Sequence, residues 1–223
     1  MNYNVAIDGP SGAGKSTIAK MLAKKLNIVY LDTGAMYRCL GLKALREQLV
    51  LADIASVQTM LDNTKVDIKI SQDNNRIFLD GEEVTNLIRT EIVGKSASDI
   101  SALPIVRIAM ANIQRQIAIK QSCILDGREI GSYVLPNAQI KIFLTASKEI
   151  RAKRRYMQLQ EQGVDTTFKK VLDSLTQRDY NDSSRSFAPL IKVADAIEVD
   201  TTELTLQQTV DKIYLIIKEK IFG

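Results

Sequence analysis

The sequence predicts an α/β fold in which a five-stranded parallel sheet is flanked by helices. Short apolar runs typical of buried strands recur along the chain and alternate with stretches that carry apolar residues at helical spacing. A glycine-rich segment lies between the first apolar run and the first helical stretch. Strands that alternate with helices imply right-handed crossovers and a parallel sheet, whose ligands bind beyond the carboxyl ends of the strands.

Five segments are expected to form the strands of this sheet. They are Val5–Ile7, Ile28–Leu31, Cys123–Leu125, Ile140–Leu144 and Ala196–Val199. Apolar residues spaced three to four apart predict a helix after the first strand and another at the end of the chain. The first helix contains Ile18, Met21, Leu22 and Leu26, and the last contains Leu206, Val210, Ile213, Ile217 and Ile221.

Two regions depart from this alternation. Residues 64–85 alternate with a period of two around the polar segments Ser71–Asn75 and Asp80–Gly81, which predicts an antiparallel hairpin with a third short strand at Val84. Residues 147–165 are dense in arginine and lysine and are interpreted as irregular. Both regions are expected to belong to a single domain that spans residues 1–223.

Composition excludes several classes of protein. With 45% hydrophobic and 25% charged residues, the chain is neither disordered nor collagen-like, and no apolar run approaches the ~18 residues that a membrane span needs. The first residues do not resemble a signal peptide, and Cys39 and Cys123 are too few for a disulfide framework, so we expect a cytosolic protein without a membrane partner. Since there is no histidine, imidazole catalysis and histidine-based zinc sites are excluded.

The strongest signal matches the pattern G-x-x-x-x-G-K-[ST] and consists of Gly9, Pro10, Ser11, Gly12, Ala13, Gly14, Lys15, Ser16 and Thr17. Its glycines allow backbone N–H groups to surround phosphate at a helix N-terminus. Lys15 can reach the β- and γ-phosphates, and the Ser16 hydroxyl can bind Mg²⁺. A glycine-rich turn without a ligand is the alternative, but the complete pattern between a strand and a helix favours a phosphate-binding loop.

Two aspartates follow expected strands. Asp126 comes after three apolar residues, an arrangement that favours a carboxylate oriented toward Mg²⁺ over a helix cap or a turn. Asp32 has a similar position, but the sequence Asp-Thr-Gly is equally typical of a simple turn.

Arginines also lie next to the expected strands. Arg38 and Arg128 come after the second and third strands, and Arg178 and Arg185 precede the last. Guanidinium groups that meet at one edge of a sheet suit transfer between two polyphosphates, although each alone is equally typical of a surface ion pair. The absence of N-K-x-D argues against a GTPase, and the short chain argues against an ATP-driven motor.

Taken together, these motifs resemble bacterial-type cytidylate (CMP/dCMP) kinases, members of the nucleoside monophosphate kinase group, essentially from end to end. The resemblance is carried by the phosphate-binding loop, Leu31–Arg38, Glu83–Thr90, Asp126–Gly131 and Arg178–Leu190. It implies a P-loop kinase that transfers phosphate from ATP to CMP or dCMP with Mg²⁺, acts as a monomer and binds no nucleic acid. It also implies a core of residues 1–62, 105–146 and 166–223, a monophosphate-binding insertion at 63–104 and a lid at 147–165.

The resemblance further implies roles for individual residues. Lys15, Arg128, Arg178 and Arg185 would be catalytic, and Arg151 and Arg154 would clamp the phosphates of ATP. Arg38, Arg128 and Arg185 would hold the acceptor phosphate, Arg178 and Asp182 would meet its sugar, and Ser98, Arg107 and Glu129 would bind cytosine. Thr33 and Tyr37 would also bind the substrate. Ser16 and Asp126 would bind Mg²⁺.

The chain departs from the family pattern at a few positions. Glu129 stands where aspartate is common, Asn181 and Ser183 stand where arginine is frequent, and Thr33 replaces serine. Two alternatives stay open: a related P-loop small-molecule kinase with a different acceptor, and a nucleic-acid-binding NTPase that uses the basic segment Lys148–Arg155.

Overall fold

The computed structural model describes residues 2–69 and 76–223, and the chain forms two compact units. Unit 1 consists of Met1–Leu31 and Lys120–Gly223, and unit 2 of Asp32–Ile119. Unit 2 therefore includes the predicted insertion at 63–104 together with residues on both sides of it. Within the described residues, no helix combines the length and the apolar character that crossing a bilayer requires.

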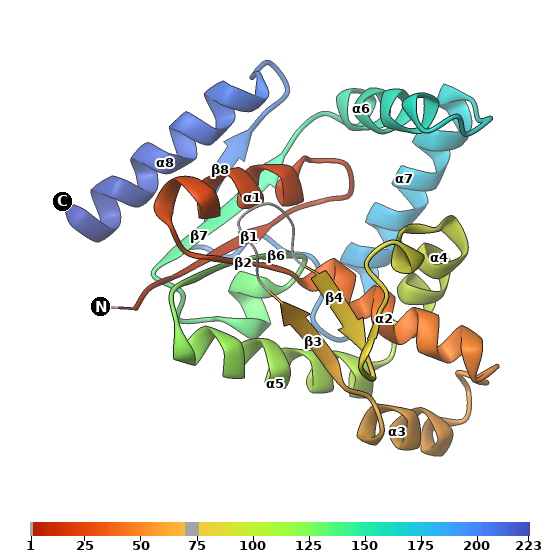
Figure 1. Cartoon of the computed structure of the whole chain (residues 1–223). Coiled ribbons are helices and arrows are strands. Elements are labelled where there is room, and N and C mark those ends of the chain that lie inside the picture. The colour runs from red at the N-terminus through yellow and green to blue at the C-terminus, as the bar shows by residue number, and fades with distance from the viewer. Residues whose placement is uncertain (1, 70–75) are drawn as a thin grey trace. The chain divides into compact units, whose positions relative to one another are not determined.

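A five-stranded sheet forms the centre of unit 1, with the strand order β2-β6-β1-β7-β8 (Figure 1). The strands are β1 (Asn4–Asp8), β2 (Val29–Asp32), β6 (Cys123–Gly127), β7 (Ile140–Thr145) and β8 (Ile197–Asp200). The pairs β1–β6, β1–β7 and β7–β8 are parallel, with Val5 opposite both Ile124 and Ile140. All five predicted strands and the parallel sheet are therefore confirmed, with ends that lie within two residues of the prediction.

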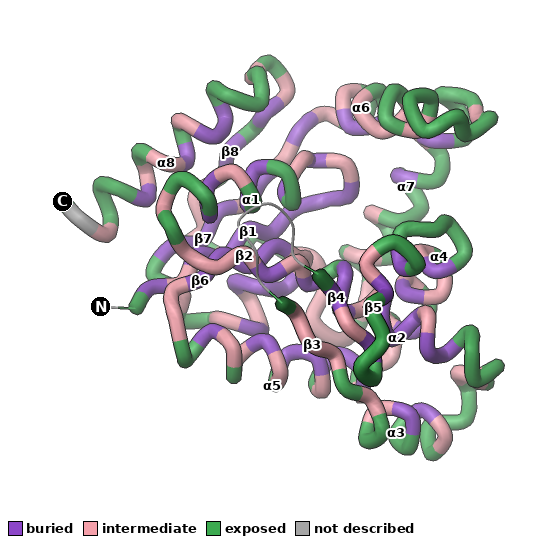
Figure 2. Tube along the Cα trace, viewed as in Figure 1, coloured by how far each residue is buried: buried purple, intermediate pink, exposed green. Residues whose placement is uncertain are grey.

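The position of each strand follows from its apolar residues. Val5, Ala6 and Ile7 are consecutive and fully buried, as expected of a central strand that is covered on both faces (Figure 2). Two helices share a hydrophobic cluster with the strands: α1 (Lys15–Leu26) through Ile18 and Leu22, and α8 (Leu206–Phe222) through Ile213 and Ile217. Both helices match the predicted apolar spacing.

Two further helices of unit 1 pack against each other, α6 (Lys148–Glu161) and α7 (Phe168–Ser184). The interpretation of 147–165 as irregular is therefore wrong over most of its length. Ser147 caps α6 by accepting a hydrogen bond from the Ile150 N–H at 3.3 Å. The helical pattern is hard to recognise in the sequence because arginine and lysine dominate it, and the residues that pack toward α7 include only a few apolar ones, such as Ala152 and Tyr156.

Unit 2 is built mainly from helices. They are α2 (Thr33–Arg46), α3 (Ile54–Asp62), the 3₁₀ turn η1 (Leu87–Arg89), α4 (Glu91–Ile100) and α5 (Pro104–Lys120), which runs to the boundary of the unit. Asp32 caps α2 by accepting a hydrogen bond from the Ala35 N–H at 2.9 Å. The sequence Asp-Thr-Gly is equally typical of a simple turn, but in the structure Asp32 is a helix cap.

A small antiparallel sheet, with the order β3-β4-β5, completes unit 2. It consists of β3 (Val66–Lys69), β4 (Arg76–Leu79) and β5 (Glu82–Glu83), which confirms the predicted three-stranded hairpin. The third strand begins at Glu82, directly after the two-residue turn Asp80–Gly81, whose positive φ angles of 51° and 90° suit a tight hairpin. Val84, where the strand was expected, adds one N–H bond to the Ile77 carbonyl. The predicted turn at Ser71–Asn75 lies outside the described residues.

Candidate functional site

The phosphate-binding loop lies between β1 and α1 in unit 1. A side chain at Gly9 would place its Cβ 2.0 Å from the Leu144 carbonyl oxygen of β7, so only glycine fits there. Gly14 has a φ of 87° and is the N-cap of α1. The loop therefore delivers the N-terminus of a 12-residue helix, which attracts anions through its N–H groups and its dipole.

Lys15 is buried at the first position of α1, and its Nζ donates a hydrogen bond to the Pro10 carbonyl at 2.7 Å. Burial is the largest influence on this group and lowers its pKa well below the usual value. The charge of Arg128 lowers the pKa further, whereas Asp126, Asp182 and Asp8 oppose this effect. A buried ammonium group beside several charged side chains gains most when an anion enters.

Asp126, near the end of β6, accepts two side-chain hydrogen bonds. The Ser16 hydroxyl donates to Oδ2 at 2.7 Å, and the Tyr30 hydroxyl donates to Oδ1 at 2.9 Å. Among the described residues, no group of three or more histidine, cysteine or carboxylate side chains is arranged around a metal position. A hydroxyl and one carboxylate still fit Mg²⁺, which keeps several waters and uses phosphate oxygens as its other ligands.

Asp8, the last residue of β1, was not predicted as a functional residue. It is buried, and its carboxylate accepts hydrogen bonds from the N–H groups of Ile130 and Gly131 at 2.8 and 2.7 Å. Burial raises the pKa of Asp8 to about 6. Asp8 thereby holds the start of η2 (Ile130–Val134), a short π-helical turn that follows Arg128 and Glu129 directly.

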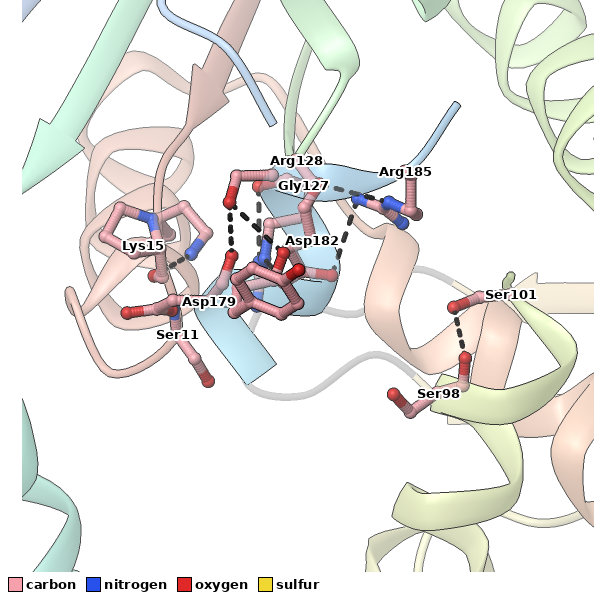
Figure 3. A network of polar contacts seen from close by, with 12 residues as sticks. Ser11, Lys15, Ser98, Ser101, Gly127, Arg128, Asp179, Asp182 and Arg185 are labelled. Carbon is pink, nitrogen blue, oxygen red and sulfur yellow. Dashed lines mark hydrogen bonds and ion pairs between the residues drawn. The ribbon is translucent and has the colours of Figure 1, made fainter. Parts of the chain in front are cut away.

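Asp182 of α7 organises two of the predicted arginines (Figure 3). Arg128 Nε donates to its Oδ2 at 2.7 Å, and Arg185 NH2 lies 3.4 Å from its Oδ1. Burial disfavours the charge on Arg128, but Asp182, Asp126 and Glu129 outweigh it and raise the pKa of the guanidinium. The structure therefore brings Arg128, Asp182 and Arg185 together, whereas Arg178 is exposed on α7.

The two arginines predicted to clamp ATP both lie on α6, and both contact other parts of unit 1. Arg151 is buried and donates to the Ser11 carbonyl at 2.8 Å and to Asp179 at 2.6 Å. Arg154 donates to the hydroxyl and the carbonyl of Thr201 at 3.0 and 2.7 Å. Arg154 also lines a cavity of about 550 Å³, together with Gly12, Gly14, Thr17, Thr201 and Thr205.

The remaining predicted residues lie in unit 2, apart from Glu129, which is buried in unit 1. Arg38 of α2 donates to the carbonyls of Ile88 and Thr90 at 2.8 and 3.2 Å. The following residues of the set lie on three helices of unit 2: Thr33 and Tyr37 on α2, Ser98 on α4 and Arg107 on α5. The guanidinium carbon of Arg107, which is buried, lies 5.5 Å from the centre of the Tyr37 ring, so these two predicted residues are in contact.

Sequence reasoning missed Asp8, Tyr30 and Asp179. Asp8 carried a signal, because a carboxylate that ends a buried strand directly before a phosphate-binding loop is unusual among apolar strand residues. Tyr30 and Asp179 are separated from their partners Asp126 and Ser11 by 96 and 168 residues. Contacts over such distances in sequence depend on the packing of the sheet and leave no local pattern.

Comparisons with known proteins show which family this chain resembles. The sequence model of the family described as cytidylate kinase matches residues 5–219. A cytidylate kinase of Caldicellulosiruptor saccharolyticus is 48% identical over 94% of this chain and 93% of its own length. One of Clostridioides difficile is 46% identical over 95% of this chain and 96% of its own length. A crystal structure of an uncharacterized protein from Eubacterium ventriosum, 18% identical, shares the fold with a TM-score of 0.52 over 98% of this chain and 99% of that one.

Proposed function

This chain belongs to the cytidylate kinase family, and we propose that it transfers the γ-phosphoryl group of ATP to CMP and dCMP, giving ADP and CDP or dCDP. One structural observation carries the proposal. Lys15 of the phosphate-binding loop belongs to the same cluster of charges as Asp126, Arg128 and Asp182. Such a cluster can bind the γ-phosphate of ATP through the lysine and the phosphate of CMP through the arginine, which places the two phosphates side by side for transfer.

On the donor side, we assign the phosphates of ATP to the loop from Gly9 to Thr17, with Lys15 at the β- and γ-phosphates. Arg151 and Arg154 are proposed to complete this site from α6, the helix of the proposed lid at 147–165. The cavity beside Gly12 and Arg154 offers room for the nucleoside of the donor. Mg²⁺, held by Ser16 and Asp126 through their oxygens, would neutralise charge on the transferring phosphate.

On the acceptor side, the proposal assigns the phosphate of CMP to Arg38, Arg128 and Arg185, and its sugar to Arg178 and Asp182. The pairing of Arg128 and Arg185 with Asp182 supports this assignment, because a shared carboxylate holds both guanidinium groups in fixed positions before the substrate arrives. Thr33 and Tyr37 are also assigned to the binding of the acceptor substrate. The monophosphate-binding insertion is proposed to span residues 63–104.

The cytosine base is assigned to Ser98, Arg107 and Glu129. Arg107 suits the O2 and N3 acceptors of cytosine, and a carboxylate accepts a hydrogen bond from the 4-amino group. Uracil presents an acceptor at position 4 and would leave a buried carboxylate without a donor. Glu129 is buried, which makes such a mismatch costly.

The reaction requires no general base from the protein. Phosphoryl transfer depends on holding the acceptor oxygen in line with the γ-phosphate and on neutralising the charge that spreads over the phosphoryl oxygens. Lys15 and the arginines supply positive charge, and the chain contains no histidine. Lys15 is buried and the side chain of Arg128 is only 19% exposed, so little water weakens their attraction for phosphate.

An assay of ATP consumption across CMP, dCMP, UMP, AMP and shikimate tests the proposal. CMP and dCMP are expected to be the preferred acceptors, and ADP and CDP should exchange phosphate in the reverse direction. If another acceptor is preferred, the chain is still a kinase, but its acceptor is not CMP. No exchange between ADP and CDP at any Mg²⁺ concentration would overturn it. We also propose that the enzyme is a cytosolic monomer. Size-exclusion chromatography with light scattering tests whether it is monomeric.

A further inference from the structure

A closed ring of hydrogen bonds holds the peptide units on both sides of Ser11, the third residue of the phosphate-binding loop. The Ser11 N–H donates to Asp179 Oδ1 at 3.1 Å, and the Ser11 carbonyl accepts from Arg151 NH1 at 2.8 Å. Arg151 NH1 also donates to Asp179 Oδ2 at 2.6 Å, which closes the ring. The two contacts reach Ser11 through its backbone, so they orient the loop itself.

The charged members of this ring are largely shielded from water. The side chain of Arg151 is 5% exposed and that of Asp179 is 16% exposed. The Asp179 carboxylate would repel a polyanion bound to the loop, and Arg151 offsets this repulsion because it forms an ion pair with Asp179. Arg151 is held in turn by the Ala146 carbonyl, which accepts from its Nε at 3.0 Å. Charge-assisted hydrogen bonds at this depth are stronger than neutral ones and define a single geometry.

Asp179 belongs to the helix that also carries residues of the proposed acceptor site. Asp182, three residues further along α7, binds Arg128 and Arg185, whereas Asp179 binds the loop (Figure 3). Residues three apart on a helix lie on the same side, one turn from each other. One turn of α7 thus contacts both the donor loop and the arginines assigned to the acceptor phosphate.

We propose that Asp179 is a positioning residue that holds the Ser11 part of the phosphate-binding loop from α7 and thereby couples the binding of the donor nucleotide to that of the acceptor. The inference rests on the proposed function, because it needs Arg128, Arg185 and Asp182 to contact the acceptor. Binding of the acceptor phosphate to Arg128 and Arg185 restrains α7 further through Asp182, and Asp179 transmits this restraint to the loop. ATP then binds to a phosphate-binding loop that is already ordered, so its affinity is higher when the acceptor is bound.

The substitution Asp179→Asn tests the coupling, because it removes the charge while keeping the size of the side chain. The measurement is the affinity for the non-hydrolysable ATP analogue AMP-PCP, with and without saturating CMP. In the parent, CMP is expected to tighten the binding of AMP-PCP. In the variant, the affinity without CMP should fall about tenfold, as for the loss of a charged hydrogen bond, and the effect of CMP should largely vanish. KM for ATP should rise more than kcat falls.

Asp173→Asn is the matched control, because Asp173 is exposed on the same helix and carries the same change of charge. It should bind AMP-PCP like the parent, and Asp179→Glu should recover part of the coupling by restoring the carboxylate. If Asp179→Asn fails to fold, the double variant Asp179→Asn/Arg151→Gln, which leaves no unpaired buried charge, takes its place, with Arg151→Gln alone as its reference. Because Arg151 is itself assigned to ATP, only the ratio of the AMP-PCP affinities with and without CMP is then compared. The proposal is overturned if CMP does not alter AMP-PCP binding in the parent, or alters it equally in the variant.

The same titrations separate this inference from the proposed function. If the parent phosphorylates CMP but Asp179→Asn binds AMP-PCP like the Asp173→Asn control, the positioning role is wrong and the function stands. If the parent fails to phosphorylate any nucleoside monophosphate while Asp179→Asn still weakens AMP-PCP binding, the function is wrong and the contact with the loop stands.

Discussion

The two units of this chain hold their candidate residues by different kinds of contact. In unit 1 the residues are held by ion pairs that are largely shielded from water, as the pairs Arg151–Asp179 and Arg128–Asp182 illustrate. In unit 2 they lie on helices that pack very closely: a Cβ added to Gly41 of α2 would lie 2.6 Å from the Ala97 nitrogen of α4. The comparison teaches that a change of charge in unit 1 should alter catalysis first, whereas a change of volume in unit 2 should alter folding first.

The largest expected effect is that of Lys15→Ala in unit 1. Loss of the buried ammonium should lower kcat/KM for ATP and CMP by ~10²–10³-fold, since one preorganised donor to the transition state disappears. Thermal stability should not fall, because burial of this charge is unfavourable in the empty loop. Steady-state kinetics and thermal unfolding measure the two effects. Lys24→Ala, exposed on the same helix, is the control, and near-parent turnover of Lys15→Ala would contradict the role of Lys15.

Asp8 tests the buried charges of unit 1 through pH. Because its pKa is raised to about 6, the folded state binds a proton more tightly than the unfolded state does. The stability that the protonated side chain contributes is full below pH ~4 and is lost as the pH rises through about 6. The whole change amounts to roughly 3 kcal/mol, since one pKa unit corresponds to ~1.4 kcal/mol.

Urea unfolding of the parent and of Asp8→Asn between pH 4 and pH 7.5 measures this contribution. The free energy of unfolding of the parent, relative to that of the variant, should fall as the pH rises. A difference that stays constant over this range would show that Asp8 titrates near its ordinary pKa in the folded protein.

Gly41→Ala tests the packing of unit 2. The added methyl group would force α2 away from α4, since it meets backbone atoms that cannot rotate aside, and should destabilise the protein by about 1–3 kcal/mol. The kcat of the fraction that remains folded should change little. Chemical denaturation is the measurement, and Leu45→Ala, at a position of α2 that is 40% exposed, is the control. Unchanged stability of Gly41→Ala would show that the two helices do not pack this closely.

The smallest expected effect is that of Tyr30→Phe. It removes the hydrogen bond to Asp126 Oδ1 but leaves the Ser16 bond to Oδ2 in place. The Mg²⁺ concentration required for half-maximal activity should rise about threefold to tenfold, in line with the loss of one hydrogen bond from a hydroxyl to a metal-binding carboxylate. A titration of AMP-PCP binding with Mg²⁺ provides a readout independent of turnover. An unchanged Mg²⁺ requirement would mean that the Tyr30 hydroxyl is not needed to orient the carboxylate.

Much of unit 1 could be predicted from its residues because the signals are local. The strands are short apolar runs, and the phosphate-binding loop is a continuous motif between a strand and a helix. The helix α6 escaped recognition because its charged residues obscure a narrow apolar side, and Asp179 escaped because its partner Ser11 is distant in sequence. The assignments of individual arginines to ATP or CMP stay predictions.

The amino-acid sequence alone determined the five strands of the parallel sheet, the phosphate-binding loop and the family to which the chain belongs. These depend on apolar periodicity and on short motifs, which neighbouring residues specify by themselves. The tertiary structure decided which charges share a partner: Asp8 with η2, Tyr30 with Asp126, and Asp179 with Ser11 and Arg151. A buried charge requires partners on several sides, and only the packing of distant segments brings such partners within hydrogen-bond distance.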